Sequence, residues 1–309
     1  MRNHPFLRLM LLSLLLLAAV ALSACAQNTA EPTPDAPEDL AIGLLVPNEI
    51  SFFTTLAAGA QDAADRLDVT LLVREAADDL ETQQAQVQEM IGQSVQAIII
   101  IPVDTEAIAA SLEAASEAGI AVFTVDRSAN TDVVVAHVAS DNAAGGRMAA
   151  EYLAEAIGEA GNVVELTGIA GTSAAQDRGR GFNDAIAGYD NIEVIARETG
   201  NFNTAEGQQA FAAVLAEQPD IQAVFAHNDD MILGAIAAAQ EAGRADDIVF
   251  VGFDAVDAAV AALEAGDLDA TIAQQPAEMG RLGIETAVAY LQGSSPDSFI
   301  PVELSLITK

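Results

Sequence analysis

Polar and aromatic side chains follow many of the predicted strands of this 309-residue chain, at the points where the strands end. The side chains are Phe52, Phe53, Asp126, Arg127, Arg178, Phe202, Asn228, Asp254 and Gln274. Aspartate accepts hydrogen bonds, arginine donates several from a rigid fork, and asparagine and glutamine do both, so together they match hydroxyl groups, which donate and accept at once. Phenylalanine faces complement the C–H surface of a sugar ring. This chemistry predicts a site for a neutral, polyhydroxylated ligand.

Each of these residues also has a purely structural interpretation. Asp126 and Arg127 could pair with each other or cap a helix, and one of residues 228–230 could cap the helix that begins near Met231. The three phenylalanines could be ordinary core residues. Loops and helix N-termini converge beyond the carboxyl ends of parallel strands, so the shared placement of the whole set at that edge favours binding.

The stretch at 163–182 combines a strand, a glycine turn and the start of a helix. The turn at 168–171 precedes a helix that is expected to begin at Thr172 or Ser173 and to carry Arg178 in its first turns. Unpaired N–H groups at a helix N-terminus attract polar groups, so the turn is either a phosphate cradle or a ledge that directs Arg178 into a cleft. No nucleotide-binding fingerprint accompanies the turn, which favours the second interpretation.

The charge balance excludes several classes of function. Acidic residues number 46 against 12 basic ones, a formal net charge of −34, and nucleic-acid binding requires a basic surface. The only lysine is Lys309, so a Walker A, Schiff-base or pyridoxal-phosphate lysine is absent from the fold. His137 and His227 lack metal-ligand spacing, and no G-x-S-x-G elbow occurs. We therefore expect no nucleic acid, no metal, no cofactor and no catalysis.

The first 24 residues have the features of a secretory signal peptide, with two arginines, an apolar run at 9–22 and small residues before the cleavage point. The only cysteine, Cys25, follows Leu22-Ser23-Ala24, an arrangement that resembles the bacterial lipobox. Residues 25–39 are rich in proline and acidic residues and predict a disordered linker. The protein is thus expected on the periplasmic or extracytoplasmic face of a membrane, held there only by lipid on Cys25.

From residue 40 onward, short β-branched runs alternate with longer alanine-rich runs of helical spacing. The run AIIII at 97–101 is apolar on both faces, as a parallel strand covered by helices requires. Strands are expected at 41–46, 69–73, 97–101, 120–125, 133–138, 162–166, 192–196, 223–226, 248–251, 270–273 and 302–307. Helices are expected, among others, at 54–67, 81–93, 105–118, 205–217, 231–242 and 277–291. Ten or eleven strands exceed one comfortable sheet and divide near 140–146, so we predict an α/β protein of two doubly wound parallel-sheet lobes.

Seven motifs, in order along the chain, resemble those of one family. They are FFTTLAAGAQ at 52–61, FTVDR at 123–127, VASDNAAGG at 138–146, ELTGIAGTSAAQDRGRGF at 165–182, VFAHND at 224–229, VGFD at 251–254 and ATIAQQP at 270–276. From about residue 40 to its end, the chain resembles the periplasmic sugar-binding proteins of ABC importers, the type I group whose fold is shared with LacI-like regulators. Within that family it is most similar to ribose-binding proteins.

The resemblance implies roles for the residues named above. Phe52 and Phe53 would stack on one side of a monosaccharide and Phe202 on the other. The hydroxyls and ring oxygen would be bound by Asp126 with Arg127, Arg178, Asn228, Asp254 and Gln274.

The resemblance also implies an organisation and a partner. The chain would cross between lobes near Ser140, Gln274 and Glu303, giving an N-terminal lobe of 40–140 plus 275–303 and a C-terminal lobe of 141–274 plus 304–309. These three crossovers would act as a hinge that closes the lobes on the sugar. The protein would act as a monomer that hands the sugar to an ABC permease.

Two positions depart from the ribose-type pattern. Where that family has asparagines before its paired phenylalanines and after its third strand, this chain has Ile50 and Ile101. An apolar wall tolerates a ligand that lacks a hydroxyl, so the ligand is expected to differ from ribose on that side, as a deoxy or smaller sugar would. Asn48 or Glu49 could instead compensate. A sugar receptor that feeds chemotaxis or a sensor kinase, a regulator and a sugar-converting enzyme are the alternative functions.

Overall fold

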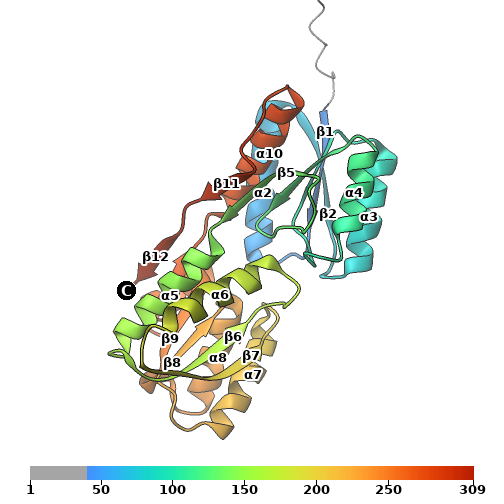
Figure 1. The fold of residues 1–309 in the computed structure, drawn as a ribbon. Coiled ribbons are helices and arrows are strands. Elements are labelled where there is room, and N and C mark those ends of the chain that lie inside the picture. The colour runs from blue at the N-terminus through green and yellow to red at the C-terminus, as the bar shows by residue number, and fades with distance from the viewer. Residues whose placement is uncertain (1–39) are drawn as a thin grey trace, which may run out of the picture. The chain divides into compact units, whose positions relative to one another are not determined.

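The computed structural model describes residues 40–309, which form two α/β lobes, each built on a six-stranded sheet (Figure 1). The predictions for residues 1–24, for Cys25 and for the linker at 25–39 lie outside the described residues. The strands are β1 (Leu40–Val46), β2 (Val69–Glu75), β3 (Ala97–Ile100), β4 (Ala121–Val125), β5 (Val134–Ser140), β6 (Ala160–Thr167), β7 (Asn191–Thr199), β8 (Ala223–Ala226), β9 (Val249–Asp254), β10 (Ala270–Ala273), β11 (Phe299–Val302) and β12 (Ser305–Thr308). The helices are α2 (Ser51–Leu67), α3 (Leu80–Gln93), α4 (Ala109–Glu117), α5 (Asn142–Ala156), α6 (Ser173–Ile186), α7 (Thr204–Glu217), α8 (Asp229–Glu241), the 3₁₀ turn η1 (Ala245–Asp247), α9 (Asp257–Ala265) and α10 (Pro276–Leu291).

The first lobe is built on a sheet with the strand order β11-β5-β4-β3-β1-β2, in which every pairing is parallel. Helices α2 and α10 lie side by side on one face, and α3 and α4 cover the other (Figure 1). Successive side chains of a strand point to opposite faces. Ile99 therefore packs into the core beside α2 and α10, and Ile98 and Ile100 into the core beside α3 and α4. This arrangement explains why β3 is apolar on both faces.

The second lobe repeats the design with the strand order β12-β10-β9-β8-β6-β7. Helices α5 and α6 cover one face of this sheet, and α7, α8 and α9 the other. All pairings are parallel except that β12 runs antiparallel to β10. The predicted fold class, two doubly wound parallel-sheet lobes, is confirmed, with one antiparallel edge strand added.

The described chain passes three times from one sheet to the other. The crossings lie after β5, between β10 and α10, and between β11 and β12. The single strand predicted at 302–307 is wrong, because Val302 pairs with β5 in the first sheet and Ser305 with β10 in the second. An alternating pattern does not reveal that the chain changes sheets at 303–304. The exact lobe boundaries stay a prediction.

Helix α4 begins four residues later than the predicted start at Thr105. The Asp104 carboxylate accepts hydrogen bonds from the N–H groups of Glu106 and Ala107, and the N–H of Thr105 bonds to the carbonyl of Gly171 in the other lobe. These contacts hold the segment in turns. The expected start of α6 is confirmed, because Thr172 is its N-cap and its hydroxyl accepts a hydrogen bond from the N–H of Ala175.

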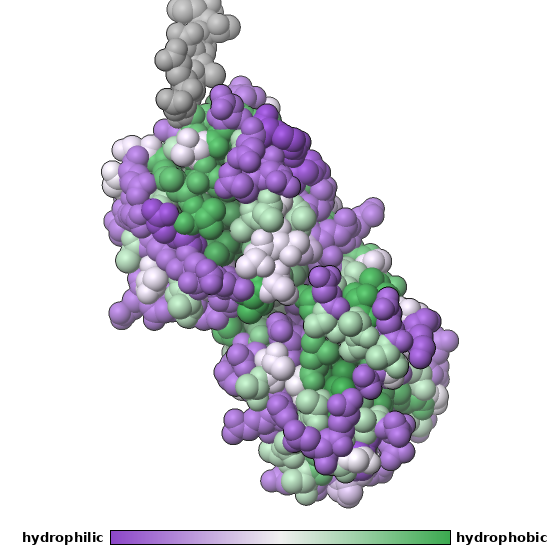
Figure 2. Space-filling model, turned by 180° about the vertical axis from the view of Figure 1, so that it is seen from behind, coloured by the Kyte–Doolittle hydropathy of each residue, from purple (hydrophilic) through white to green (hydrophobic). Residues whose placement is uncertain are grey.

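Hydrophilic residues cover much of the face shown in Figure 2, with smaller groups of hydrophobic residues between them. Among residues 40–309, the large apolar side chains with substantial exposure are Leu67, Val73, Tyr290, Phe299 and Leu306. None of the helices in this part of the chain combines the length and the apolar character that a bilayer crossing requires.

Candidate functional site

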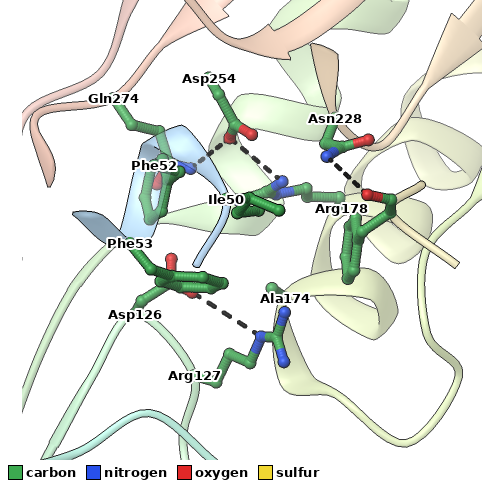
Figure 3. Close-up of a pocket in the computed structure, with 11 residues that line it drawn as sticks. Ile50, Phe52, Phe53, Asp126, Arg127, Ala174, Arg178, Asn228, Asp254 and Gln274 are labelled. Carbon is green, nitrogen blue, oxygen red and sulfur yellow. Dashed lines mark hydrogen bonds and ion pairs between the residues drawn. The ribbon is translucent and has the colours of Figure 1, made fainter. Parts of the chain in front are cut away.

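The nine residues predicted to bind a ligand all line one cavity (Figure 3). Two further residues complete its wall, Ile50 and Ala174. Because Asp126 follows β4 of the first sheet and Arg178 belongs to α6 of the second lobe, the cavity is formed by both lobes. The lining combines charged, amide and aromatic side chains, as sites for small ligands do.

In the part of the cavity that the second lobe forms, Arg178 is the central residue. Its Nε donates to Asn142 Oδ1 at 2.8 Å, and one terminal nitrogen donates to the backbone carbonyl of His227 and lies 3.5 Å from Asp254 Oδ1. Gln274 Nε2 donates to the same Asp254 oxygen at 2.7 Å (Figure 3). The side chain of Arg178 is only 4% exposed. A buried guanidinium needs this many partners, so its direction into the cavity is fixed before any ligand arrives.

Aromatic rings and the second arginine line the opposite part of the cavity. The guanidinium carbon of Arg127 lies 5.3 Å from the ring centre of Phe53 and 5.4 Å from that of Phe202, so it sits between an aromatic ring of each lobe. Phe52 and Phe53 meet edge to face, with ring centres 5.3 Å apart. Arg127 and Asp126 are both buried, and their charged groups approach to 3.8 Å. Flat apolar walls with charges between them suit a ring that is apolar on its faces and polar at its rim.

Three of the nine residues have a positive backbone φ angle, which is unfavourable for residues with a side chain. Their φ angles are 61° at Asp126, 58° at Phe202 and 121° at Asp254. Such conformations cost on the order of 1–3 kcal/mol each and persist where the surrounding structure holds them, typically at functional sites. The cavity is therefore shaped at some expense of stability.

Three buried polar atoms of the cavity make no hydrogen bond with any described residue. They are Asp126 Oδ1, Arg127 Nε and Gln274 Oε1. Buried polar groups are nearly always paired in native proteins. Two acceptors and one donor at the cavity wall match a ligand whose groups both donate and accept.

Burial controls the ionisation of these groups. It raises the pKa of Asp126 against the opposing effect of Arg127 and Arg178, and it lowers the pKa of Arg127. Burial also raises the pKa of Asp254 to about 7, although Arg178 and the hydrogen bond from Gln274 oppose the increase. For Asp254, the loss of water around the carboxylate disfavours the charged form more than the ion pair with Arg178 favours it.

The pKa of Asp254 leads to a prediction about stability. Between about pH 4 and pH 7, Asp254 keeps its proton in the folded protein and has lost it in the unfolded chain. The stabilisation due to this proton is therefore complete below pH 4 and is lost as the pH rises to about 7. Asp254→Asn mimics the protonated form. We expect it to raise the free energy of unfolding of the sugar-free protein by about 1–3 kcal/mol at pH 8 and to change it little at pH 4.

Urea unfolding of both proteins at several pH values measures this effect. The difference between wild type and variant isolates Asp254 from the other acidic residues. A difference that does not depend on pH would contradict the prediction.

Asn228 caps a helix and also lines the cavity. Its Oδ1 accepts a hydrogen bond from the N–H of Met231 and caps α8, while its Nδ2 donates to the carbonyl of Phe202 at the cavity wall. The predicted helix start at Met231 is therefore two residues late. A single asparagine thus caps α8 and places a polar group at the cavity wall.

The two isoleucines that depart from the ribose-type pattern differ in position. Ile50 lines the cavity, whereas Ile101 is fully buried in the core of the first lobe and does not line it. Asn48 does not replace the missing group, because its Nδ2 donates to both carboxylate oxygens of Asp78 and its Oδ1 accepts from the N–H of Ile50. Glu49 is exposed and is not a lining residue. Of the two departures, only the one at Ile50 therefore changes the cavity wall.

The turn at 168–171 forms a seam between the lobes. The N–H of Ser173 donates to Thr105 Oγ1 at 3.0 Å, the N–H of Ser128 donates to Ser173 Oγ at 2.8 Å, and the N–H of Thr105 donates to the carbonyl of Gly171 at 2.8 Å. Donors that a phosphate cradle would need are therefore already used within the protein. Gly168 packs against the ring of Phe202, where a Cβ would lie 2.1 Å from a ring carbon. The structure supports the interpretation in which the turn positions Arg178.

Residues 42–295 match the family model described as "Periplasmic binding protein domain". The chain belongs to the periplasmic binding protein family. It is 40% identical over 294 residues to the ribose import binding protein RbsB of Escherichia coli (strain K12), covering 95% of this chain and 97% of that protein. It is 37% identical over 300 residues to the RbsB protein of Bacillus subtilis (strain 168), covering 96% of each.

A solved member of the family has a closely similar fold. The ABC transporter solute binding protein of Bacillus halodurans C-125 with bound myo-inositol superposes with a TM-score of 0.84 at 31% sequence identity, covering 89% of this chain and 96% of that one. The family resemblance predicted from the motifs is confirmed.

Several groups that build the cavity were not predicted. Ala174 forms part of its wall, and Asn142 and the carbonyl of His227 hold Arg178. Asn142 falls within the motif at 138–146, which was recognised without a role for this residue. A backbone carbonyl leaves no trace in the sequence.

Proposed function

We propose that this periplasmic binding protein captures a monosaccharide between its lobes and delivers it, chemically unchanged, to the permease of an ABC importer. The observation that carries the proposal is that one cavity combines hydroxyl-matching groups from both lobes with aromatic walls. Relatives named for ribose import, and a fold neighbour with bound myo-inositol, support a polyhydroxylated ligand.

The contacts between lobes support a mechanism of closure. When the lobes are apart, the cavity would be divided into two half-sites, one with Asp126 and Arg127 and the other with Arg178 and Asp254. A sugar that bonds to both sets bridges them, and closure then removes water from hydrogen bonds that strengthen in a buried site. The seam at Thr105 and Ser173 adds contacts that form only in the closed state. The permease would recognise this closed form.

The wall at Ile50 supports a narrower proposal about the ligand. An apolar side chain gives no hydrogen bond to a hydroxyl and leaves that hydroxyl without a partner on closure. We therefore expect a deoxy or smaller sugar to bind at least as well as ribose.

Calorimetric titration tests both statements. The purified protein is titrated with ribose, 2-deoxyribose, arabinose and myo-inositol, and the sugar is then recovered and shown to be unchanged. Ile50→Asn is the matched variant, because it restores a polar group at this one position, and it should favour ribose over 2-deoxyribose. Binding of none of these sugars would contradict the proposed function. Tighter binding of ribose than of 2-deoxyribose by the wild type would contradict only the narrower proposal.

A lipid anchor completes the proposal. Its support is the sequence Leu22-Ser23-Ala24-Cys25 after an apolar run and before an acidic, proline-rich segment. A lipid on Cys25 would hold the sugar-binding lobes close to the permease without a spanning helix. In cells grown with labelled palmitate, we expect the wild-type protein to be labelled and to sediment with membranes. Cys25→Ala should lose both properties, and a labelled variant would refute the anchor.

A further inference from the structure

A buried carboxylate lies directly behind the cavity without lining it. Asp229 is the first residue of α8 and is fully buried. Its Oδ1 accepts a hydrogen bond from Thr271 Oγ1 at 2.8 Å, and its Oδ2 accepts one from the N–H of Val256 at 2.9 Å. Thr271 Oγ1 in turn accepts from the N–H of Ala255 at 3.2 Å. Together the two side chains hold the two backbone N–H groups that follow Asp254.

This backbone is in a conformation that needs support. The φ angles are 121° at Asp254 and 55° at Ala255, both unfavourable for residues with a side chain. Such a pair persists where neighbouring groups determine it. The direction of the Asp254 carboxylate depends on this backbone, and that carboxylate meets Arg178 and Gln274 at the cavity wall.

The contacts of Asp229 differ from those of an ordinary acidic residue at a helix start. Such a residue is stabilised by the N–H groups of its own helix. Both oxygens of Asp229 instead reach outside α8, to β10 and to the loop after β9. Burying a carboxylate is costly, so its retention here calls for a role.

We propose that Asp229 is a positioning residue that sets the sugar contact of Asp254. The proposal rests on the proposed function, because it assumes that Asp254 binds the sugar. If it is correct, the effect of Asp229 on sugar affinity depends on Asp254. A general contribution of Asp229 to stability would not depend on Asp254 in this way.

A double-mutant cycle tests the proposal. The Kd of Asp229→Ala, Asp254→Asn and the double variant is measured with whichever sugar of the ribose, 2-deoxyribose, arabinose and myo-inositol panel binds the wild type most tightly. Binding too weak for calorimetry is followed through the sugar-dependent rise in melting temperature. We expect Asp229→Ala to raise the Kd about fivefold. In the Asp254→Asn background, the same change should have no further effect.

Two variants separate positioning from stability. Asp269→Ala is the matched control, because Asp269 Oδ2 accepts from the N–H of Phe250 at 2.8 Å near the other end of β9. It should lower the melting temperature and leave the Kd unchanged. Thr271→Val removes the hydrogen bond from the N–H of Ala255 and the one to Asp229, with little change of shape, and replaces Asp229→Ala if that variant does not fold. It should also raise the Kd only where Asp254 is present.

The outcomes that overturn the proposal are distinct. An unchanged Kd in Asp229→Ala or Thr271→Val, or effects that add to that of Asp254→Asn, would show that Asp229 does not act through Asp254, while the proposed function stands. A wild-type protein that binds no sugar of the panel would overturn the proposed function and this inference with it.

Discussion

Arg178→Ala is expected to leave a folded protein that binds sugar at least about 100-fold more weakly than the wild type. The variant removes a buried guanidinium with no replacement, and hydrogen bonds to charged groups contribute roughly 1.5–3 kcal/mol each. It also leaves Asp254 without its nearest cation, at a carboxyl whose pKa is already raised to about 7. That carboxyl can take up a proton, so the loss of the charge pair need not unfold the lobe.

The control for this prediction lies two residues further along the same helix. Arg180 is 59% exposed and pairs with Asp177 at the surface, so Arg180→Ala should bind sugar as the wild type does. Calorimetry gives the affinity of each variant, and circular dichroism with thermal unfolding shows whether the fold is kept. An affinity of Arg178→Ala within a few fold of the wild type would refute the assignment of the cavity.

The element order and most of the cavity could be predicted from sequence because both depend on local patterns. Runs that are apolar on both faces mark covered parallel strands, and residues that directly follow such strands share one edge of the sheet. That rule was sufficient for Asp126, Asn228 and Gln274. Each lies within two residues of the end of its strand.

Features that depend on contacts between distant segments could not be predicted. His227 stands alone in the sequence, yet its Nε2 lies 2.9 Å from Glu165 Oε1 and its Nδ1 accepts a hydrogen bond from the N–H of Gly168. Burial is the largest effect on the pKa of Glu165 and would raise it, but hydrogen bonds from His227, Asn183 and Arg197 together lower it. Ile101 directly follows β3, as Asp126 directly follows β4, but Ile100 pairs with Thr124, so β3 ends one residue earlier than β4 in the sheet register. Because successive side chains point to opposite faces, the side chain of Ile101 lies in the core.

The seam between the lobes provides the second large effect, and it lies outside the cavity. Gly171 has no left-handed backbone, so alanine fits its own lobe, but a Cβ there would lie 2.3 Å from Asp104 Oδ2 of the other lobe. Asp104 cannot easily turn away, because its other oxygen holds the N–H groups of Glu106 and Ala107. Gly171→Ala is therefore expected to create a steric clash with Asp104 only when the lobes close, and we call this clash a wedge.

A wedge of this kind should weaken binding without touching the sugar. The measured Kd equals the intrinsic value divided by the fraction of protein able to close, so a penalty of about 1.4 kcal/mol on closure raises the Kd about tenfold. Small-angle X-ray scattering should show a larger radius of gyration for Gly171→Ala than for the wild type at equal, subsaturating sugar. Gly92→Ala, whose Cβ would meet no atom within 4 Å, is the matched control and should change neither quantity.

Removal of the opposing side chain decides whether the seam is the cause. Asp104→Ala takes away the atoms that a Cβ at Gly171 would meet, so the double variant should regain most of the affinity that Gly171→Ala loses. If affinity is lost and the second change does not restore it, the effect of Gly171→Ala arises within its own lobe. If affinity is never lost, closure does not bring Gly171 and Asp104 into contact. Recovery would show that part of the free energy of sugar binding is set at a contact that the sugar never makes, since the same closure that buries Arg178 must also fit Gly171 against Asp104.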